Sequence, residues 1–175
     1  MLVDLLNLYF DCQVPAIVEH GGEVLKFMGD GLLAIFLLAE GTTDANKACD
    51  CALSAAREAK VNIDAIEAPA SSGDGHGIRF GLALHLGEVL YGNIGSGNRL
   101  DFTCIGPAIN LAARLEKLAA GLGRTIILSA EFAQHSSVDL EPLSEFVVPG
   151  FATAQKAFGL QAGSSVQSVG GEDIL

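Results

Sequence analysis

Apolar residues recur every three to four positions in three stretches of the chain, the spacing that places them on one face of an α-helix. The first stretch predicts a helix over residues 2–20, with a kink or break at Pro15. In the second, Thr43 and Asp44 can cap a helix that runs to about residue 66. The third predicts a helix over residues 107–120, with proline at its first position, where proline is favoured.

Runs of alternating or uniformly apolar residues bounded by glycine predict strands. The clearest pair flanks Gly29-Asp30-Gly31, a tight turn that needs φ > 0 and therefore predicts a hairpin. Two segments, residues 68–77 and 92–98, are rich in glycine, serine or proline and are expected to be loops. The strands are expected at residues 23–28, 32–37, 78–85, 88–91, 100–105, 124–128, 146–148 and 155–160.

The order of these elements predicts an α+β domain with a ferredoxin-like βαββαβ sandwich, in which helices and hairpins pack around one sheet. The chain opens with a helix, whereas that pattern begins with a strand. One domain is expected over residues 1–160. The Gly- and Ser-rich residues 161–175 are expected to form a disordered tail.

The excess of acidic residues argues against some classes of function. The chain has 10 Lys and Arg against 21 Asp and Glu, a net charge of −11, which argues against nucleic-acid binding. A nucleotide ligand is still compatible, because Mg²⁺ can bridge acidic side chains and a polyphosphate. The four cysteines lack zinc-site spacing, no apolar run approaches the ~20 residues of a membrane span, and the start does not resemble a signal peptide. A soluble cytoplasmic domain is therefore expected.

Two sets of polar residues could carry chemistry. Asp30 stands at the tip of the predicted hairpin, where a carboxylate can bind Mg²⁺, and Lys26 precedes it by four residues. Asn110 and Arg114 are neighbours on a face of the third helix that differs from its apolar face, where they could hold a ribose and a phosphate. Taken singly, the first set is more typical of an ordinary turn, and the second of a solvated helix face that Lys117 continues.

Three longer segments, taken together and in this order, resemble the motifs of class III adenylate/guanylate cyclase catalytic domains. They are GGEVLKFMGDG around Asp30, GLALHLGEV with the GNIG that follows it, and FTCIGPAINLAARLE around Asn110. The resemblance extends from about Leu2 to about Leu160, nearly all of the chain before the tail.

The resemblance implies conversion of ATP or GTP to the 3′,5′-cyclic monophosphate and pyrophosphate with two Mg²⁺ ions (or Mn²⁺), at sites formed where two domains pair head to tail. It makes Asp30 a metal ligand, and Lys26 and Thr103 the pair that reads the purine edge. That pair favours ATP, because a lysine can donate a hydrogen bond to adenine N1. It makes Asn110 the residue that orients the ribose, and Arg114 the residue that stabilises charge at the α-phosphate.

Two departures from the family pattern bear on activity. The family begins with a strand of the type Phe-x-Asp-(Ile/Leu)-x-Gly-Phe-Thr, whose aspartate is the other metal ligand, and nothing before Leu2 supplies it. The chain is therefore expected to be N-terminally truncated, to lack its first strand, and to have weak or no activity. A phosphate-binding lysine of the family aligns with Pro149, and Lys156 is not an obvious substitute.

The sequence thus predicts an adenylate cyclase domain that acts on ATP as a homodimer or paired with another cyclase domain. A guanylate cyclase is one alternative. Another is a non-catalytic cyclase-like domain that dimerises or binds nucleotide as a regulator, which the missing aspartate and Pro149 favour. A ferredoxin-like RNA-binding module is disfavoured, because the chain has no aromatic RNA-binding strand and its charge has the wrong sign.

Overall fold

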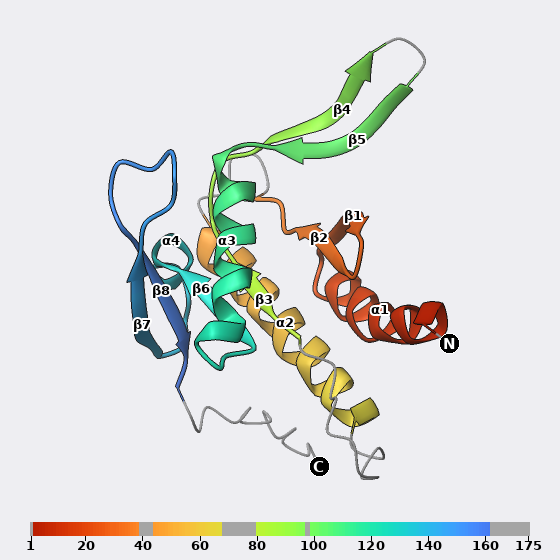
Figure 1. The fold of residues 1–175 in the computed structure, drawn as a ribbon, viewed down its shortest axis with the longest axis horizontal. Helices are drawn as coiled ribbons and strands as arrows, with labels where there is room; N and C mark the ends of the chain where they lie inside the picture. Colours follow the sequence, from red (N-terminus) through yellow and green to blue (C-terminus); the bar gives the residue numbers. More distant parts are fainter. Residues whose placement is uncertain (1, 39–43, 68–79, 97–98, 162–175) are drawn as a thin grey trace, which may run out of the picture.

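The computed structural model describes residues 2–38, 44–67, 80–96 and 99–161. In this part of the chain, four helices and eight strands form the α+β arrangement that the sequence predicts (Figure 1). None of the described helices is both long enough and apolar enough to cross a membrane. The elements are α1 (Leu2–Glu19), β1 (Glu23–Met28), β2 (Gly31–Ile35), α2 (Ala45–Glu67), β3 (Leu82–Leu84), β4 (Leu90–Ser96), β5 (Arg99–Ile105), α3 (Pro107–Gly121), β6 (Ile126–Ser129), α4 (Ala130–Ala133), β7 (Leu140–Phe146) and β8 (Gln155–Leu160).

The strands form three separate sheets, so the expectation of one sheet was wrong. β3, β6, β8 and β7 form the largest sheet in that order, and its β3–β6 pair is parallel. β1 pairs with β2, and β4 pairs with β5, in two antiparallel hairpins. In the described part of the chain, β2 and β3 each have a strand partner on one edge only, so no strand joins the β1–β2 hairpin to the largest sheet.

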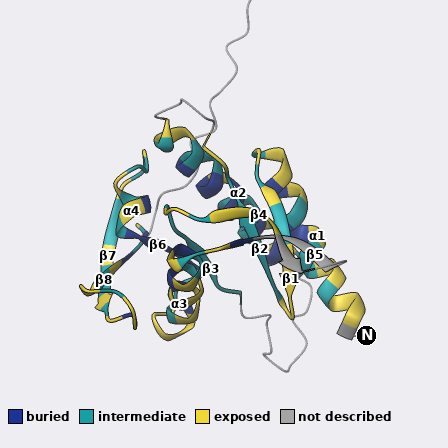
Figure 2. Cartoon of the chain, turned by 90° about the horizontal axis from the view of Figure 1, so that it is seen from above, coloured by how far each residue is buried: buried dark blue, intermediate teal, exposed yellow. Residues whose placement is uncertain are grey.

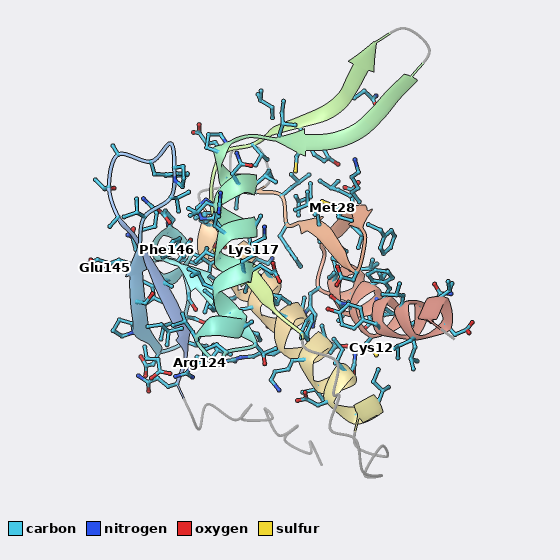
Figure 3. The ribbon with its side chains drawn as sticks, in the orientation of Figure 1. Cys12, Met28, Lys117, Arg124, Glu145 and Phe146 are labelled. Carbon is cyan, nitrogen blue, oxygen red and sulfur yellow. The ribbon has the colours of Figure 1, made fainter. Side chains whose placement is uncertain are left out.

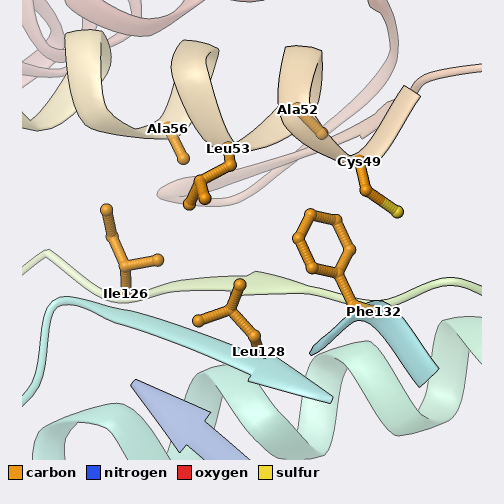
Figure 4. Packing of buried hydrophobic residues seen from close by; sticks show 7 residues of the cluster. All are labelled: Cys49, Ala52, Leu53, Ala56, Ile126, Leu128 and Phe132. Carbon is orange, nitrogen blue, oxygen red and sulfur yellow. The ribbon is translucent and has the colours of Figure 1, made fainter. Parts of the chain in front are cut away.

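The main core lies between α2 and the sheet. Leu53 of α2 faces Leu128 and Phe132, and all three are nearly or fully buried (Figure 4). Ala52 and Ala56 on the same side of α2 let the helix approach the sheet closely. Burial of this apolar surface fixes α2 across one face of the sheet.

A second core lies under α3. The helix buries one face, made by Ala108, Leu111, Leu115 and Ala119. Leu111 and Leu115 pack in a cluster with Ile127 of β6 and Ala157 of β8. Exposed residues lie on the outer side of α3 and along β4, whereas buried ones gather between the helices and the largest sheet (Figure 2). α3 is therefore a rigid platform with one free face.

The helix ends follow local rules. α1 ends at Glu19 and is followed by Gly21, whose φ of +83° lets the Gly22 N–H donate to the Ile17 carbonyl at 2.8 Å, a Schellman-type ending. Asp44 caps α2 as predicted, since its Oδ1 accepts from the Lys47 N–H at 3.1 Å. The predicted break at Pro15 was wrong, because α1 continues through it. Pro15 is exposed, so the carbonyl that loses a helical hydrogen bond can reach water.

Several strand boundaries also differ from the prediction. The expected glycine loop at residues 92–98 is largely strand, because β4 runs to Ser96 and pairs with β5 through the backbone, which glycine does not prevent. β3 spans only Leu82–Leu84, and β7 ends at Phe146 rather than beginning there. The loop expected at residues 68–77 and the tail expected at residues 161–175, apart from residue 161, lie outside the described residues.

Candidate functional site

The tip of the β1–β2 hairpin presents two of the predicted site residues. Met28 pairs with Gly31, leaving Gly29 and Asp30 as a two-residue turn. Gly29 has φ +65° and Asp30 does not have positive φ, the pattern of a type II′ hairpin turn. The strand register shifts between Val24 and Lys26, which marks a bulge before the lysine. Lys26 on β1 and Asp30 in the hairpin turn are both exposed.

The surroundings of Asp30 bear on metal binding. Burial raises the pKa of the nearby Tyr9 to about 12, and the negative charges of Asp30 and Glu116 add to this rise. Within the described residues, no group of three or more His, Cys, Asp and Glu could hold a metal ion. An exposed carboxylate is a suitable oxygen ligand for Mg²⁺. Asp30 therefore fits as one metal ligand, and the described residues do not complete a site around it.

The β4–β5 hairpin, which contains Thr103, lies against β1, the strand of Lys26. The backbone of Thr103 pairs with Gly92, although its side chain lies outside what the structure describes. β5 contacts β1, and the Tyr91 hydroxyl of β4 donates a hydrogen bond to Glu23 of β1 at 2.9 Å. The strands that hold Lys26 and Thr103 are thus neighbours. The Tyr91–Glu23 bond was not predicted, because its partners lie 68 residues apart in the sequence.

The free face of α3 presents the other predicted pair. Asn110 and Arg114 are exposed, one helical turn apart, on the side opposite the buried residues of the helix. Among the described residues, neither side chain has a hydrogen bond or an ion pair. A guanidinium without a protein partner can bind a phosphate in a two-pronged geometry. α3 begins at Pro107, and the residue before it, Gly106, has a φ of 150°, a conformation that favours glycine.

The structure groups the predicted residues into two sets and does not join them. Lys26 and Asp30 share one hairpin, and Asn110 and Arg114 share one helix. In the described part of the chain, no hydrogen bond or ion pair connects that hairpin to α3. A cavity of about 470 Å³ lies elsewhere, between the ends of α2 and α3, where Phe80, Glu116 and Arg124 line it. None of the predicted site residues lines this cavity.

His85 and Pro149 lie outside the two sets of predicted site residues. His85 Nδ1 lies 2.8 Å from the Ser129 hydroxyl, which also caps α4 by accepting from the Phe132 N–H. Burial lowers the pKa of His85, and the nearby Glu131 carboxylate partly offsets this. Through Ser129, this histidine supports the start of α4. Pro149 lies in the connection between β7 and β8, where it offers neither a charge nor a backbone N–H to a phosphate.

The amino-acid sequence is similar to those of known adenylate cyclases. No family model matches the chain. It is 34% identical over 136 residues to an adenylate cyclase of Anabaena cylindrica, covering 75% of this chain and 26% of that protein. It is 31% identical over 156 residues to adenylate cyclase 1 of Rhizobium meliloti, covering 87% of this chain and 23% of that protein. The chain thus spans about a quarter of the length of these relatives.

Solved structures have the same fold. A bacterial light-regulated adenylyl cyclase superposes with a TM-score of 0.75 at 26% identity, over 90% of this chain and 44% of that one. The adenylyl cyclase CyaB from P. aeruginosa has a TM-score of 0.71 at 24% identity, over 97% and 85%. With the matched relatives, this similarity shows that the chain belongs to the class III adenylyl/guanylyl cyclase catalytic domains.

Proposed function

We propose that this domain converts ATP to 3′,5′-cyclic AMP and pyrophosphate for intracellular signalling. The observation that carries the proposal is the free face of α3, where Asn110 and Arg114 stand exposed and without a protein partner above a fully packed core. The relatives named adenylate cyclase support the same reaction. All four cysteines, Cys12, Cys49, Cys51 and Cys104, are free, which suits the reducing cytoplasm.

The reaction needs a held ribose and a stabilised α-phosphate. The ribose 3′-oxygen forms a bond to the α-phosphorus, the bond from that phosphorus to the β-phosphate oxygen breaks, and pyrophosphate leaves while the hydroxyl proton passes to solvent. Asn110 can hold the ribose in position for this attack. Arg114 can donate to the α-phosphate oxygens as negative charge builds there. Both residues lie on a helix whose buried face is fixed, so their positions are set before ATP binds.

Lys26 and Thr103 are the proposed purine contacts. Lys26 can donate to adenine N1, an acceptor, whereas guanine carries a donor at N1 and would require an acceptor such as glutamate. The contact between β1 and β5 supports this pairing. A guanylyl cyclase remains the alternative substrate assignment, since guanylyl cyclase domains share the fold.

Asp30 is the proposed ligand for Mg²⁺ or Mn²⁺. Mg²⁺ is commonly held by one or two carboxylates together with substrate phosphates and water, so one exposed carboxylate can take part. When bound, the metal would lower the pKa of the 3′-hydroxyl and neutralise phosphate charge.

We place the complete site between two copies of the domain, since Asp30 and Arg114 share no described contact within one chain. Exposed apolar side chains support this pairing, because such residues mark interaction surfaces when they cluster. Phe27 and Met28 on β1 are 53% and 50% exposed, and Leu90 and Ile105 at the base of the β4–β5 hairpin are 70% and 47% exposed.

A non-catalytic cyclase-like domain is the second candidate. It is favoured by the lack of a carboxylate cluster among the described residues and by Pro149 at the expected phosphate position. Such a domain would dimerise or bind nucleotide without turning it over.

The two candidates are separated by measuring cyclic AMP and cyclic GMP formed from Mg- or Mn-bound ATP and GTP. The chain is assayed alone and fused at its N-terminus to a strand of the type Phe-x-Asp-(Ile/Leu)-x-Gly-Phe-Thr. Cyclic AMP formation that disappears in Asp30→Ala supports the proposal. Nucleotide binding without product in either form would favour the regulatory domain, and predominant cyclic GMP would favour the guanylyl cyclase.

A further inference from the structure

The exposed face of α3 has positive charge without negative charge beside it. The helix contains three charged residues, Arg114, Glu116 and Lys117. Glu116 turns toward β3, since a Cβ placed on Gly81 would lie only 3.2 Å from its Oε1. The free face is therefore left with Arg114 and Lys117, both exposed.

The helical neighbours of Lys117 offer it no counter-charge. Residues three and four positions away on a helix are the ones whose side chains meet. For Lys117 they are Ala113, Arg114, Ala120 and Gly121, none of which is acidic. Two like charges at this spacing repel and slightly destabilise a helix. An anion bound between them would remove that repulsion.

Three other cations of the described chain have acidic partners. Lys60 pairs with Asp64 on α2, Lys156 with Glu145 across β7 and β8, and Arg124 with Glu141. In a chain with 21 acidic and 10 basic residues, partners are readily available. Figure 3 labels Lys117 on α3, apart from Glu145 and Arg124, which belong to these pairs. Lys26, Lys47 and Arg57 have no described ion pair either, so the α3 face is distinguished by two cations one helical turn apart, Arg114 and Lys117, with no acidic side chain beside them.

We propose that Lys117 binds the β- and γ-phosphates of the nucleoside triphosphate, and the pyrophosphate that forms from them. This inference rests on the proposed function and extends it by one residue. Asn110, Arg114 and Lys117 follow one another at intervals of four and three residues along one helix face. If Asn110 holds the ribose and Arg114 the α-phosphate, the remaining phosphates continue toward Lys117.

Lys117 also supplies a positive charge that the connection between β7 and β8 lacks. Residues 147–154, between β7 and β8, contain no lysine or arginine, and Pro149 stands where the family pattern has a lysine. Lys156, the next cation, lies 3.5 Å from the Glu145 carboxylate and is already paired. A lysine is a compact charge on a flexible stem and can follow phosphates that move during the reaction.

Binding of inorganic tripolyphosphate by calorimetry tests the inference without requiring turnover. Lys117→Met removes the charge and keeps a long side chain with good helix propensity. It should weaken tripolyphosphate binding about tenfold, the loss of one charge-assisted contact. Lys117→Arg should retain most of the affinity. Lys47→Met, at another exposed lysine without a described ion pair, serves as the matched control and should bind like the unsubstituted chain.

The same variants separate this inference from the proposed function. If ATP is turned over, Lys117→Met should raise KM for ATP and the inhibition constant of pyrophosphate together, while kcat changes less. If ATP is not turned over, the proposed cyclase activity fails, and the tripolyphosphate measurement still decides the role of Lys117. Equal tripolyphosphate affinity in Lys117→Met and Lys47→Met, or no binding by the unsubstituted chain, would overturn the inference.

Discussion

The hydroxyl of Tyr91 donates a hydrogen bond to the Glu23 carboxylate at 2.9 Å and fastens the β4–β5 hairpin to the first strand of the β1–β2 hairpin. Partial desolvation and the Glu23 carboxylate both raise the pKa of Tyr91. A phenol already keeps its proton at neutral pH, because its ordinary pKa is about 10, and it can therefore act as the donor. Three residues after Glu23 comes Lys26, and opposite Tyr91 lies the strand that contains Thr103. The bond therefore helps to hold together the two hairpins that contain the proposed purine contacts.

Removing this bond should affect substrate binding more than stability. Tyr91→Phe keeps the ring and deletes the donor at an exposed position, where single hydrogen bonds contribute little to stability. We expect KM for ATP to rise severalfold, with thermal unfolding little changed. Steady-state kinetics and a melting curve measure both quantities. Glu23→Gln is the control that keeps an acceptor at the same place, and equal KM values in Tyr91→Phe and the unsubstituted chain would contradict the account.

The platform under α3 should be sensitive to truncation. Leu115 is fully buried and packs in one cluster with Ile127 and Ala157. Leu115→Ala should lower the free energy of unfolding by about 2–5 kcal/mol, because it leaves a cavity. Val61→Ala, at a position that is 64% exposed on α2, should change it by less than about 0.5 kcal/mol. Urea denaturation measures both, and similar losses in the two variants would show that α3 is not anchored through Leu115.

His85 should make stability depend on pH. Burial lowers its pKa in the folded state below the ordinary value of about 6.5, and Glu131, 3.7 Å from Nδ1, only partly opposes this. The unfolded chain then binds the proton more readily, so the contribution of His85 is complete above pH 6.5 and is lost as the pH falls below it. Melting temperatures should drop more between pH 7.5 and 5.5 for the unsubstituted chain than for His85→Gln. Parallel curves for the two proteins would contradict this assignment.

The hairpin and helix of the candidate site could be predicted from the sequence because their signals are local. Gly29-Asp30-Gly31 specifies a turn by itself, and the spacing of Leu111 and Leu115 specifies which face of α3 is buried and hence that Asn110 and Arg114 are free. The separation into three sheets was not predicted, because strand pairing joins residues far apart and no local pattern encodes it. The role now proposed for Lys117 was missed for a related reason, since a free charge is recognised only when the partners of the other charges are known.

The most direct test of the central claim is complementation between two inactive variants in the strand-fused form. If the site takes Asp30 from one copy and Arg114 from its partner, Asp30→Ala and Arg114→Ala should each abolish cyclic AMP formation. Mixing them should restore it, because half of the dimers would be mixed and each mixed dimer has one intact site. We predict recovery of about a quarter of the unsubstituted activity, assuming random pairing and independent sites. No recovery on mixing two folded, dimeric variants would contradict a shared cyclase site.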